Sequence, residues 1–103
     1  MELKKGITLM GVKPELLIGL MVCNSVYSNH NQELVVTAVT DGKHSSTSLH
    51  YNGCALDLRT RYFEPSEVEQ VAAEIRERLT VDFDVVVESD HIHLEFQPRY
   101  ASN

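Results

Sequence analysis

Two short segments of strict alternation constrain the fold of this 103-residue chain more than any other feature. In residues 54 to 59 and 91 to 97, apolar side chains occupy the even positions and most polar ones the odd positions. This period of two predicts extended strands with one buried face and one polar face. The apolar set comprises Cys54, Leu56, Leu58, Ile92, Leu94 and Phe96. Histidine and carboxylate side chains therefore share the polar face of the expected sheet.

Residues 13 to 27 predict a first helix. Pro14 suits its first position and Glu15 the positive end of its dipole. Apolar residues cover nearly the whole circumference, so we expect a helix that is buried on all sides. Residues 34 to 40 are rich in valine and threonine and predict a strand that ends in a turn at Asp41 and Gly42.

A second helix is expected to begin at Pro65 and Ser66. Ser66 and Glu69 have the spacing of a capping box, and Glu74 and Arg78 the spacing of an i, i+4 ion pair. One face of this helix is apolar, at positions 68, 71, 72, 75 and 79. A hairpin follows, with strands over 84 to 88 and 91 to 97 and a turn at Ser89 and Asp90. The order predicts an α+β fold, a small antiparallel sheet with two main helices, in a single domain over residues 1–103.

Charge and composition exclude several classes of protein. The 15 acidic and 9 basic residues give a net charge of −6, which argues against nucleic-acid binding. The longest apolar stretch, about eight residues from Leu16 to Cys23, is far shorter than the roughly 20 that span a bilayer. We expect no membrane insertion and no signal peptide, and therefore synthesis in the cytoplasm. Cys23 and Cys54 are expected to be buried thiols in a reducing compartment.

Four of the five histidines fall in two segments that also contain Asp57 and Asp90. Histidine and carboxylate ligands with one open position are typical of catalytic zinc, which lowers the pKa of bound water to about 7. His50 and Asp57 differ by an odd number of positions, so they converge only if the chain bends, as Asn52 and Gly53 allow. Parity does not distinguish His91 from His93 as a ligand. His30 lies in an asparagine-rich loop and is expected to be exposed.

Residues 48 to 57 have the form SxHxxGxAxD, and residues 90 to 93 the form [DE]xxH. Together they resemble the zinc D-Ala-D-Ala carboxypeptidase and L-alanyl-D-glutamate endopeptidase family. That family includes phage endolysins and has the hedgehog/DD-peptidase fold. The resemblance covers about half of the chain, from Gly42 to Phe96, and agrees with the order of the expected elements.

The resemblance implies a role for each matching position. His50, Asp57 and His93 match the three zinc ligands, which selects His93 over His91. Asp90 matches the catalytic carboxylate that activates water and passes its proton to the leaving amine. Ser48 matches a serine that contacts substrate, although a loop serine at this position can equally cap a backbone group.

One departure from the family concerns the oxyanion. The usual upstream arginine is missing between Thr37 and Ser48, where only Lys43 or His44 could replace it. Arg59 shares a strand face with Asp57, where it either anchors a substrate carboxylate or is solvated.

We therefore expect a zinc metallopeptidase that hydrolyses peptidoglycan stem peptides, of phage or prophage origin, acting on the cell wall after release. The alternative is a non-catalytic, zinc-stabilised binding or virion structural module of the same fold. Neither the scissile bond nor the oligomeric state follows from the sequence.

Overall fold

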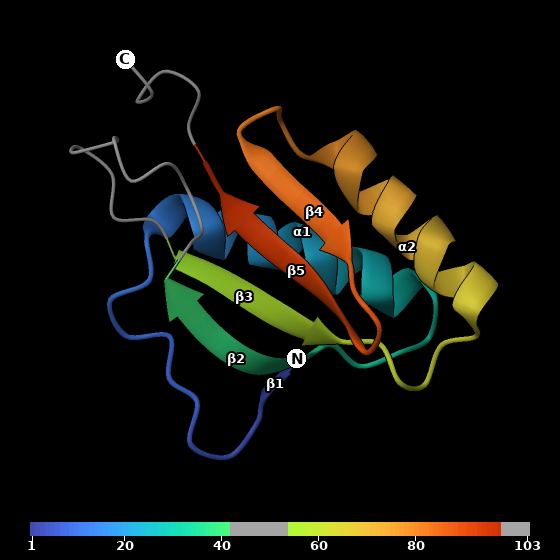
Figure 1. The fold of residues 1–103 in the computed structure, drawn as a ribbon, viewed down its shortest axis with the longest axis horizontal. Coiled ribbons are helices and arrows are strands. Elements are labelled where there is room, and N and C mark those ends of the chain that lie inside the picture. Colours follow the sequence, from blue (N-terminus) through green and yellow to red (C-terminus); the bar gives the residue numbers. More distant parts are fainter. Residues whose placement is uncertain (42–53, 98–103) are drawn as a thin grey trace.

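A computed structural model of the chain describes residues 1–41 and 54–97. Two helices, α1 (Pro14–Asn29) and α2 (Pro65–Arg78), alternate along the chain with five strands (Figure 1). The strands are β1 (Glu2–Leu3), β2 (Val35–Asp41), β3 (Cys54–Arg59), β4 (Phe83–Val87) and β5 (His91–Phe96). Both expected helices and all four expected strands are present, so the α+β prediction is confirmed.

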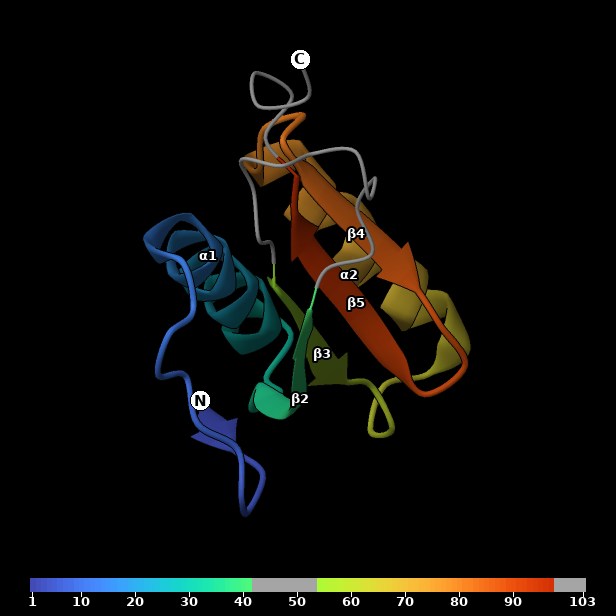
Figure 2. The same cartoon turned by 60° about the vertical axis from the view of Figure 1, so that its left-hand side comes forward.

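The strands form one sheet in the order β1-β2-β3-β5-β4. Both helices cover the same face of this sheet (Figures 1 and 2), and no helix or strand of the described residues covers the other face, called the open face below. The three pairings β2–β3, β3–β5 and β5–β4 are antiparallel, but β1 pairs with β2 in parallel. The expectation of a purely antiparallel sheet is therefore wrong at this edge, because the two-residue β1 has no alternation by which the sequence could reveal it.

The core lies between the sheet and the helices. Leu56, Leu58, Ile92 and Leu94 are fully buried there, as the alternation of β3 and β5 predicts. From the helices, the core receives these fully buried side chains: Leu16, Cys23, Val26, Val71, Ala72 and Ile75. The Cys23 thiol has its pKa raised by burial to about 12, so it behaves as a small apolar group, as expected. The side chain of Cys54 lies outside the described residues.

α1 is not buried on all sides, which corrects the expectation from its composition. Ile18 and Met21 are 61% and 69% exposed, respectively. Only one face of α1 packs against the sheet. Because α1 is apolar around most of its circumference, its packing in the fold, and not its hydrophobic pattern, decides which apolar residues are buried. Near-uniform hydrophobicity is therefore no measure of burial here.

The start and the ion pair of α2 also differ from expectation. Glu64 is the N-cap, Pro65 occupies the first turn, and no side chain caps the helix, so Ser66 does not form a capping box. Proline fixes the helical φ one residue earlier than the serine would. Glu74 bonds to His30, and Arg78 donates a hydrogen bond to Ser25, instead of pairing with each other.

A bulge in β2 lies beside the sheet's polar centre. Val36 pairs with Leu58, yet Ala38 pairs with Asp57, so Thr37 is an extra residue in β2. The Thr37 hydroxyl donates a hydrogen bond of 3.3 Å to the backbone carbonyl of Asp57. The bulge therefore bends β2 beside Asp57, a candidate site residue, and bulges are common next to functional sites.

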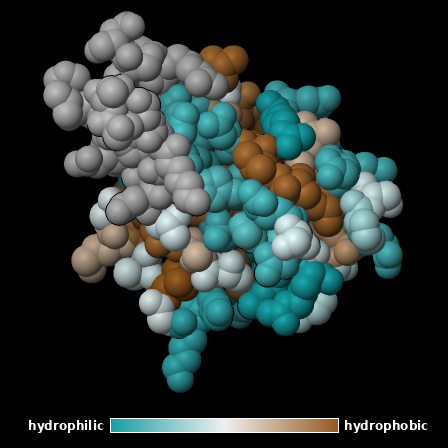
Figure 3. Space-filling view, in the orientation of Figure 1, coloured by the Kyte–Doolittle hydropathy of each residue, from teal (hydrophilic) through white to brown (hydrophobic). Residues whose placement is uncertain are grey.

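The open face of the sheet is largely hydrophilic over β5, with an apolar band over β4 (Figure 3). Val86 of β4 is 43% exposed there. Within the described ranges, neither helix has the length and apolar character needed to cross a membrane.

Candidate metal centre

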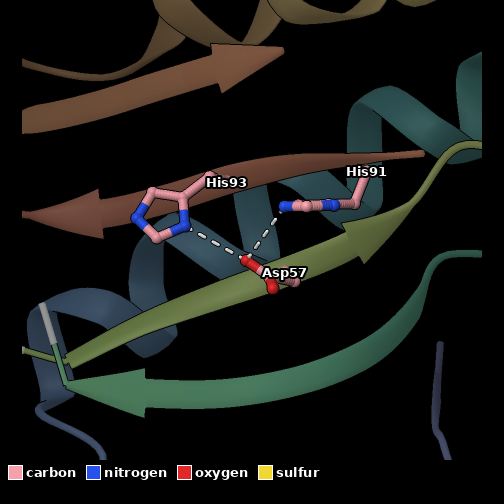
Figure 4. Close-up of side chains that lie close together, drawn as sticks. All are labelled: Asp57, His91 and His93. Carbon is pink, nitrogen blue, oxygen red and sulfur yellow. Dashed lines mark hydrogen bonds and ion pairs between the residues drawn. The ribbon is translucent and has the colours of Figure 1, made fainter. Parts of the chain in front are cut away.

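Asp57, His91 and His93 meet on the open face, at the centre of the β3–β5 pair (Figure 4). Asp57 lies directly opposite His93, and Arg59 opposite His91, in the antiparallel register. Oδ1 of Asp57 is 3.1 Å from Nδ1 of His93 and 3.6 Å from Nε2 of His91. All three side chains are partly buried, with 21% to 27% of each exposed. The alternation read from the sequence therefore brings these groups to one point.

Glu95 holds the second nitrogen of the His93 ring. Nε2 of His93 lies 2.9 Å from Oε1 of Glu95, whose side chain is only 4% exposed. Gln97 in turn donates a hydrogen bond to Oε2 of Glu95. Burial alone would lower the pKa of His93, but the hydrogen bonds to Glu95 and Asp57 outweigh it and raise that pKa above its ordinary value. In the absence of a metal ion, a proton on each ring nitrogen satisfies both carboxylates.

Asp90 holds the second nitrogen of the His91 ring. Nδ1 of His91 lies 2.6 Å from Oδ1 of Asp90, in the turn between β4 and β5. The carboxylate of Asp90 is 82% exposed, and the hydrogen bond to His91 lowers its pKa. Asp90 is therefore ionised at neutral pH and lies beside the cluster, at the strand end where the sequence places it.

The arrangement fits a metal ion on two counts. Ligand atoms of Asp57, His91 and His93 all lie within 4.8 Å of one another. Neighbouring donors around a tetrahedral zinc are roughly 3.4 Å apart, given bond lengths of about 2.0 to 2.2 Å, and the observed separations of 3.1 and 3.6 Å bracket this. In addition, each histidine directs one nitrogen at Asp57 and binds a carboxylate through the other. Such second partners orient metal-bound histidines in many proteins.

The structure describes only some of the expected site residues. It brings Asp57 and His93 together and places Asp90 beside them. His50 and Ser48, and the oxyanion candidates Lys43 and His44, lie outside the described residues. His91, which the family resemblance set aside, approaches Asp57 as well.

Glu95 was missed by the sequence reasoning. Its signal was present, because it follows His93 by two positions on the same strand face.

Two cavities flank the cluster, and both include Asp57 and His91 in their walls. The first, of about 390 Å³, lies towards the Arg59 end of β3 and is lined by the basic residues Lys4, Arg59 and Arg61. The second, of about 560 Å³, lies over β4 and β5, and none of the described residues in its wall is a lysine or an arginine. Its acidic residues are Asp57, Asp84, Glu88 and Glu95. The candidate metal centre therefore separates a basic hollow from an acidic one.

His30 is not exposed, which corrects the expectation for its loop. Its ring is 16% exposed and lies between two glutamates of α2, with Nδ1 3.0 Å from Glu67 and Nε2 2.5 Å from Glu74. The hydrogen bonds to Glu74 and Glu67 raise the pKa of His30. These partners lie on an element far along the chain, so the local sequence could not reveal them.

No protein-family model, curated protein or solved structure matches the chain. The motif and the geometry of this centre are therefore the features of the chain that bear on its function.

Proposed function

We propose that the protein is a zinc-dependent peptidase of peptidoglycan stem peptides, of the D-Ala-D-Ala carboxypeptidase or L-alanyl-D-glutamate endopeptidase type. On this proposal the chain has the hedgehog/DD-peptidase fold, originates from a phage or prophage, and acts on the cell wall after release. The observation that supports it best is the convergence of Asp57, His91 and His93 beside an ionised Asp90. Two of these residues and Asp90 occupy matching positions in the motif.

Asp57 and His93 would hold the zinc ion, with His50 as the third ligand by analogy with the family. His93 is preferred to His91 because it occupies the third ligand position of the motif, and it also lies directly opposite Asp57 in the sheet. A zinc ion in such a centre polarises the peptide carbonyl and lowers the pKa of water.

Asp90 would act as the general base. Its lowered pKa keeps the carboxylate ionised at neutral pH, so it is able to accept a proton from the attacking water. It would then deliver that proton to the amine that leaves when the peptide bond breaks. Its position in the β4–β5 turn gives it access to solvent and to the first cavity.

The hydrogen bond from His91 to Asp90 also supports the alternative, a zinc-stabilised binding module. In such a module, Asp90 would serve only to orient His91. The two functions predict different results when the Asp90 carboxylate is removed.

The test measures zinc content and the fragments released from purified peptidoglycan, by mass spectrometry, for wild type, Asp90→Ala and the neighbouring control Ser89→Ala. A peptidase releases stem-peptide fragments, and Asp90→Ala loses that activity while it retains zinc. Full activity in Asp90→Ala would overturn the mechanism. Zinc binding without any cleavage by wild type would favour the binding module. The mass of the fragments identifies the scissile bond.

A further inference from the structure

The basic hollow beside the candidate metal centre gathers positive charge, although the chain as a whole is acidic. The chain has 9 basic residues and a net charge of −6, yet Lys4, Arg59 and Arg61 line this one cavity. They come from three places in the fold: Lys4 follows β1, Arg59 ends β3, and Arg61 lies in the turn before α2. Three like charges around one cavity repel each other, and a bound anion would reduce that repulsion.

The carboxylates in the wall of this hollow are already engaged. Oδ1 of Asp57 faces both histidines, and Oδ1 of Asp90 accepts a hydrogen bond from His91. Within residues 1–41 and 54–97, no ion pair joins Lys4, Arg59 or Arg61 to an acidic side chain. Arg61 lies instead over the ring of Tyr62, with 5.5 Å between its guanidinium carbon and the ring centroid. The cationic groups therefore remain available to a ligand.

Arg59 is the central group of this set. It follows Asp57 by two positions on the same face of β3, a separation of about 7 Å along a strand. It also lies opposite His91 in β5. Its backbone carbonyl accepts a hydrogen bond of 2.9 Å from the buried Tyr27 hydroxyl, which fixes the strand end from which the guanidinium projects. The planar guanidinium of an arginine is suited to bidentate binding of a carboxylate.

We infer that the hollow lined by Lys4, Arg59 and Arg61 binds a carboxylate of the substrate peptide next to the bond that is cleaved. This inference rests on the proposed peptidase function and adds a specificity subsite to it. An extended peptide advances 3.3 to 3.6 Å per residue, so a carboxylate at Arg59 belongs to a residue within about two positions of the centre. The acidic hollow on the other side of Asp57 repels a second anion and therefore favours one orientation of the peptide.

Two sources of such a carboxylate exist in stem peptides: the C-terminus of a terminal residue, and the free carboxylate of an internal acidic residue. Two matched peptide pairs distinguish them. The first is N-acetyl-D-Ala-D-Ala and its C-terminal amide, and the second is L-Ala-D-Glu and L-Ala-D-isoglutamine. In each pair the amide removes one carboxylate charge, at the C-terminus in the first pair and at the α-carboxyl of the D-Glu residue in the second, and leaves the scissile bond unchanged.

The experiment measures kcat and KM for the four peptides with zinc-loaded wild type, Arg59→Gln, Arg59→Lys and the control Arg78→Gln. Arg78 lies at the end of α2 and donates a hydrogen bond to Ser25. For the preferred pair, we expect KM to rise 10- to 100-fold on amidation, and by a similar factor for the acid in Arg59→Gln. Arg59→Lys should recover part of the loss, and Arg78→Gln should change KM for neither the acid nor the amide. Equal KM values for acid and amide, or equal losses for both in Arg59→Gln, would overturn the inference.

A second measurement does not depend on activity. The Arg59 Nε–H resonance is followed by NMR, with and without zinc, as each acid and its amide are added in turn: N-acetyl-D-alanine and its amide, then L-Ala-D-Glu and L-Ala-D-isoglutamine. For the pair whose acid gives the larger shift, the acid shifts this resonance in both states, and the amide does not. A shift without hydrolysis of any peptide would leave the subsite standing and refute the peptidase. The same lack of response to acid and amide would refute the subsite, whatever the protein hydrolyses.

Discussion

Asp57 and His93 are direct partners across the β3–β5 pair, and Oδ1 of Asp57 lies 3.1 Å from Nδ1 of His93. The same oxygen is 3.6 Å from Nε2 of His91, two positions earlier on β5. One carboxylate oxygen thus faces two imidazoles, which is a favourable arrangement for a proton or for a metal ion. A metal ion replaces the proton on the ring nitrogen that it binds, so metal affinity in this centre depends on pH.

The first prediction concerns the two histidines. His93→Ala should lose zinc, with an affinity at least tenfold lower, about 1.4 kcal/mol. His91→Ala should retain zinc, because the motif assigns the ligand position to His93 and His91 is not directly opposite Asp57. Zinc content after gel filtration and competition with a chelator measure both effects.

His50→Ala completes this set of variants. A loss of zinc in this variant would agree with the ligand assignment taken from the motif. If His91→Ala loses zinc and His50→Ala does not, the centre consists of Asp57, His91 and His93, and the assignment to His50 is wrong. Asp57→Asn should lose zinc in either case.

The second prediction concerns the partner of His93. Glu95→Gln keeps the size of the side chain but removes the charge that faces Nε2 of His93. We expect zinc affinity to fall by about 10- to 100-fold, as for other partners of metal-bound histidines. Chelator competition measures the affinity. Glu88→Gln, in the wall of the same acidic cavity, is the matched control and should have little effect. Equal losses in both variants would indicate a general effect of charge rather than orientation of His93.

The third prediction concerns His30, which joins the end of α1 to α2. Because its two ring nitrogens face Glu67 and Glu74, the folded protein favours the protonated ring, and the pKa rises above its ordinary value of 6.5. A raised pKa in the folded state means that the extra stability is fully present below about pH 6.5. It is lost as the pH rises through the folded-state pKa.

His30→Gln should therefore lower the free energy of unfolding at pH 5.5 by about 1 kcal/mol, a modest value because the glutamates are partly exposed and solvent screens the pair. At pH 9 the loss should be much smaller, because deprotonation of the ring removes its ion pairs with Glu67 and Glu74. Urea unfolding across this pH range measures the difference. In the double variant Glu67→Gln, Glu74→Gln, the pH dependence attributable to His30 should disappear. A loss that grows with pH would contradict the assignment.

The sequence predicted the part of the site that depends on alternation. Leu56, Leu58, Ile92 and Leu94 fix which face of β3 and β5 is buried, and this forces Asp57, His91 and His93 onto the open face. The alternation is a property of the local sequence, so it determines which residues share a face of the strand without reference to distant segments. Parity places both His91 and His93 on the open face, so it cannot decide which of them is the ligand.

The features that the sequence did not predict depend on contacts between distant segments. β1 pairs with β2 through two residues only, and the bulge at Thr37 appears only in the register of β2 against β3. His30 finds Glu67 and Glu74 because α1 packs beside α2. Pro65 shows the limit of a local rule, since it starts α2 before Ser66 could cap it.

The last prediction concerns Gly19, where α1 approaches β4. A Cβ atom at this position would lie 2.6 Å from Cε1 of Phe83, whose ring packs against Phe96 with 5.1 Å between centroids. Alanine in a helix normally gains about 1 kcal/mol over glycine. Overpacking costs about 1 to 3 kcal/mol, and the Phe83 ring cannot withdraw freely because Phe96 lies against it.

We therefore expect Gly19→Ala to lower the free energy of unfolding by about 1 kcal/mol, which lowers Tm by roughly 4 to 8 °C in a domain of this size. Thermal unfolding followed by circular dichroism measures the change. The control Ser28→Ala, at an exposed position of the same helix, should be neutral or slightly stabilising. In a Phe83→Leu background the clash is relieved, so Gly19→Ala should become neutral or stabilising there. An unchanged loss in that background would show that the ring of Phe83 is not the cause.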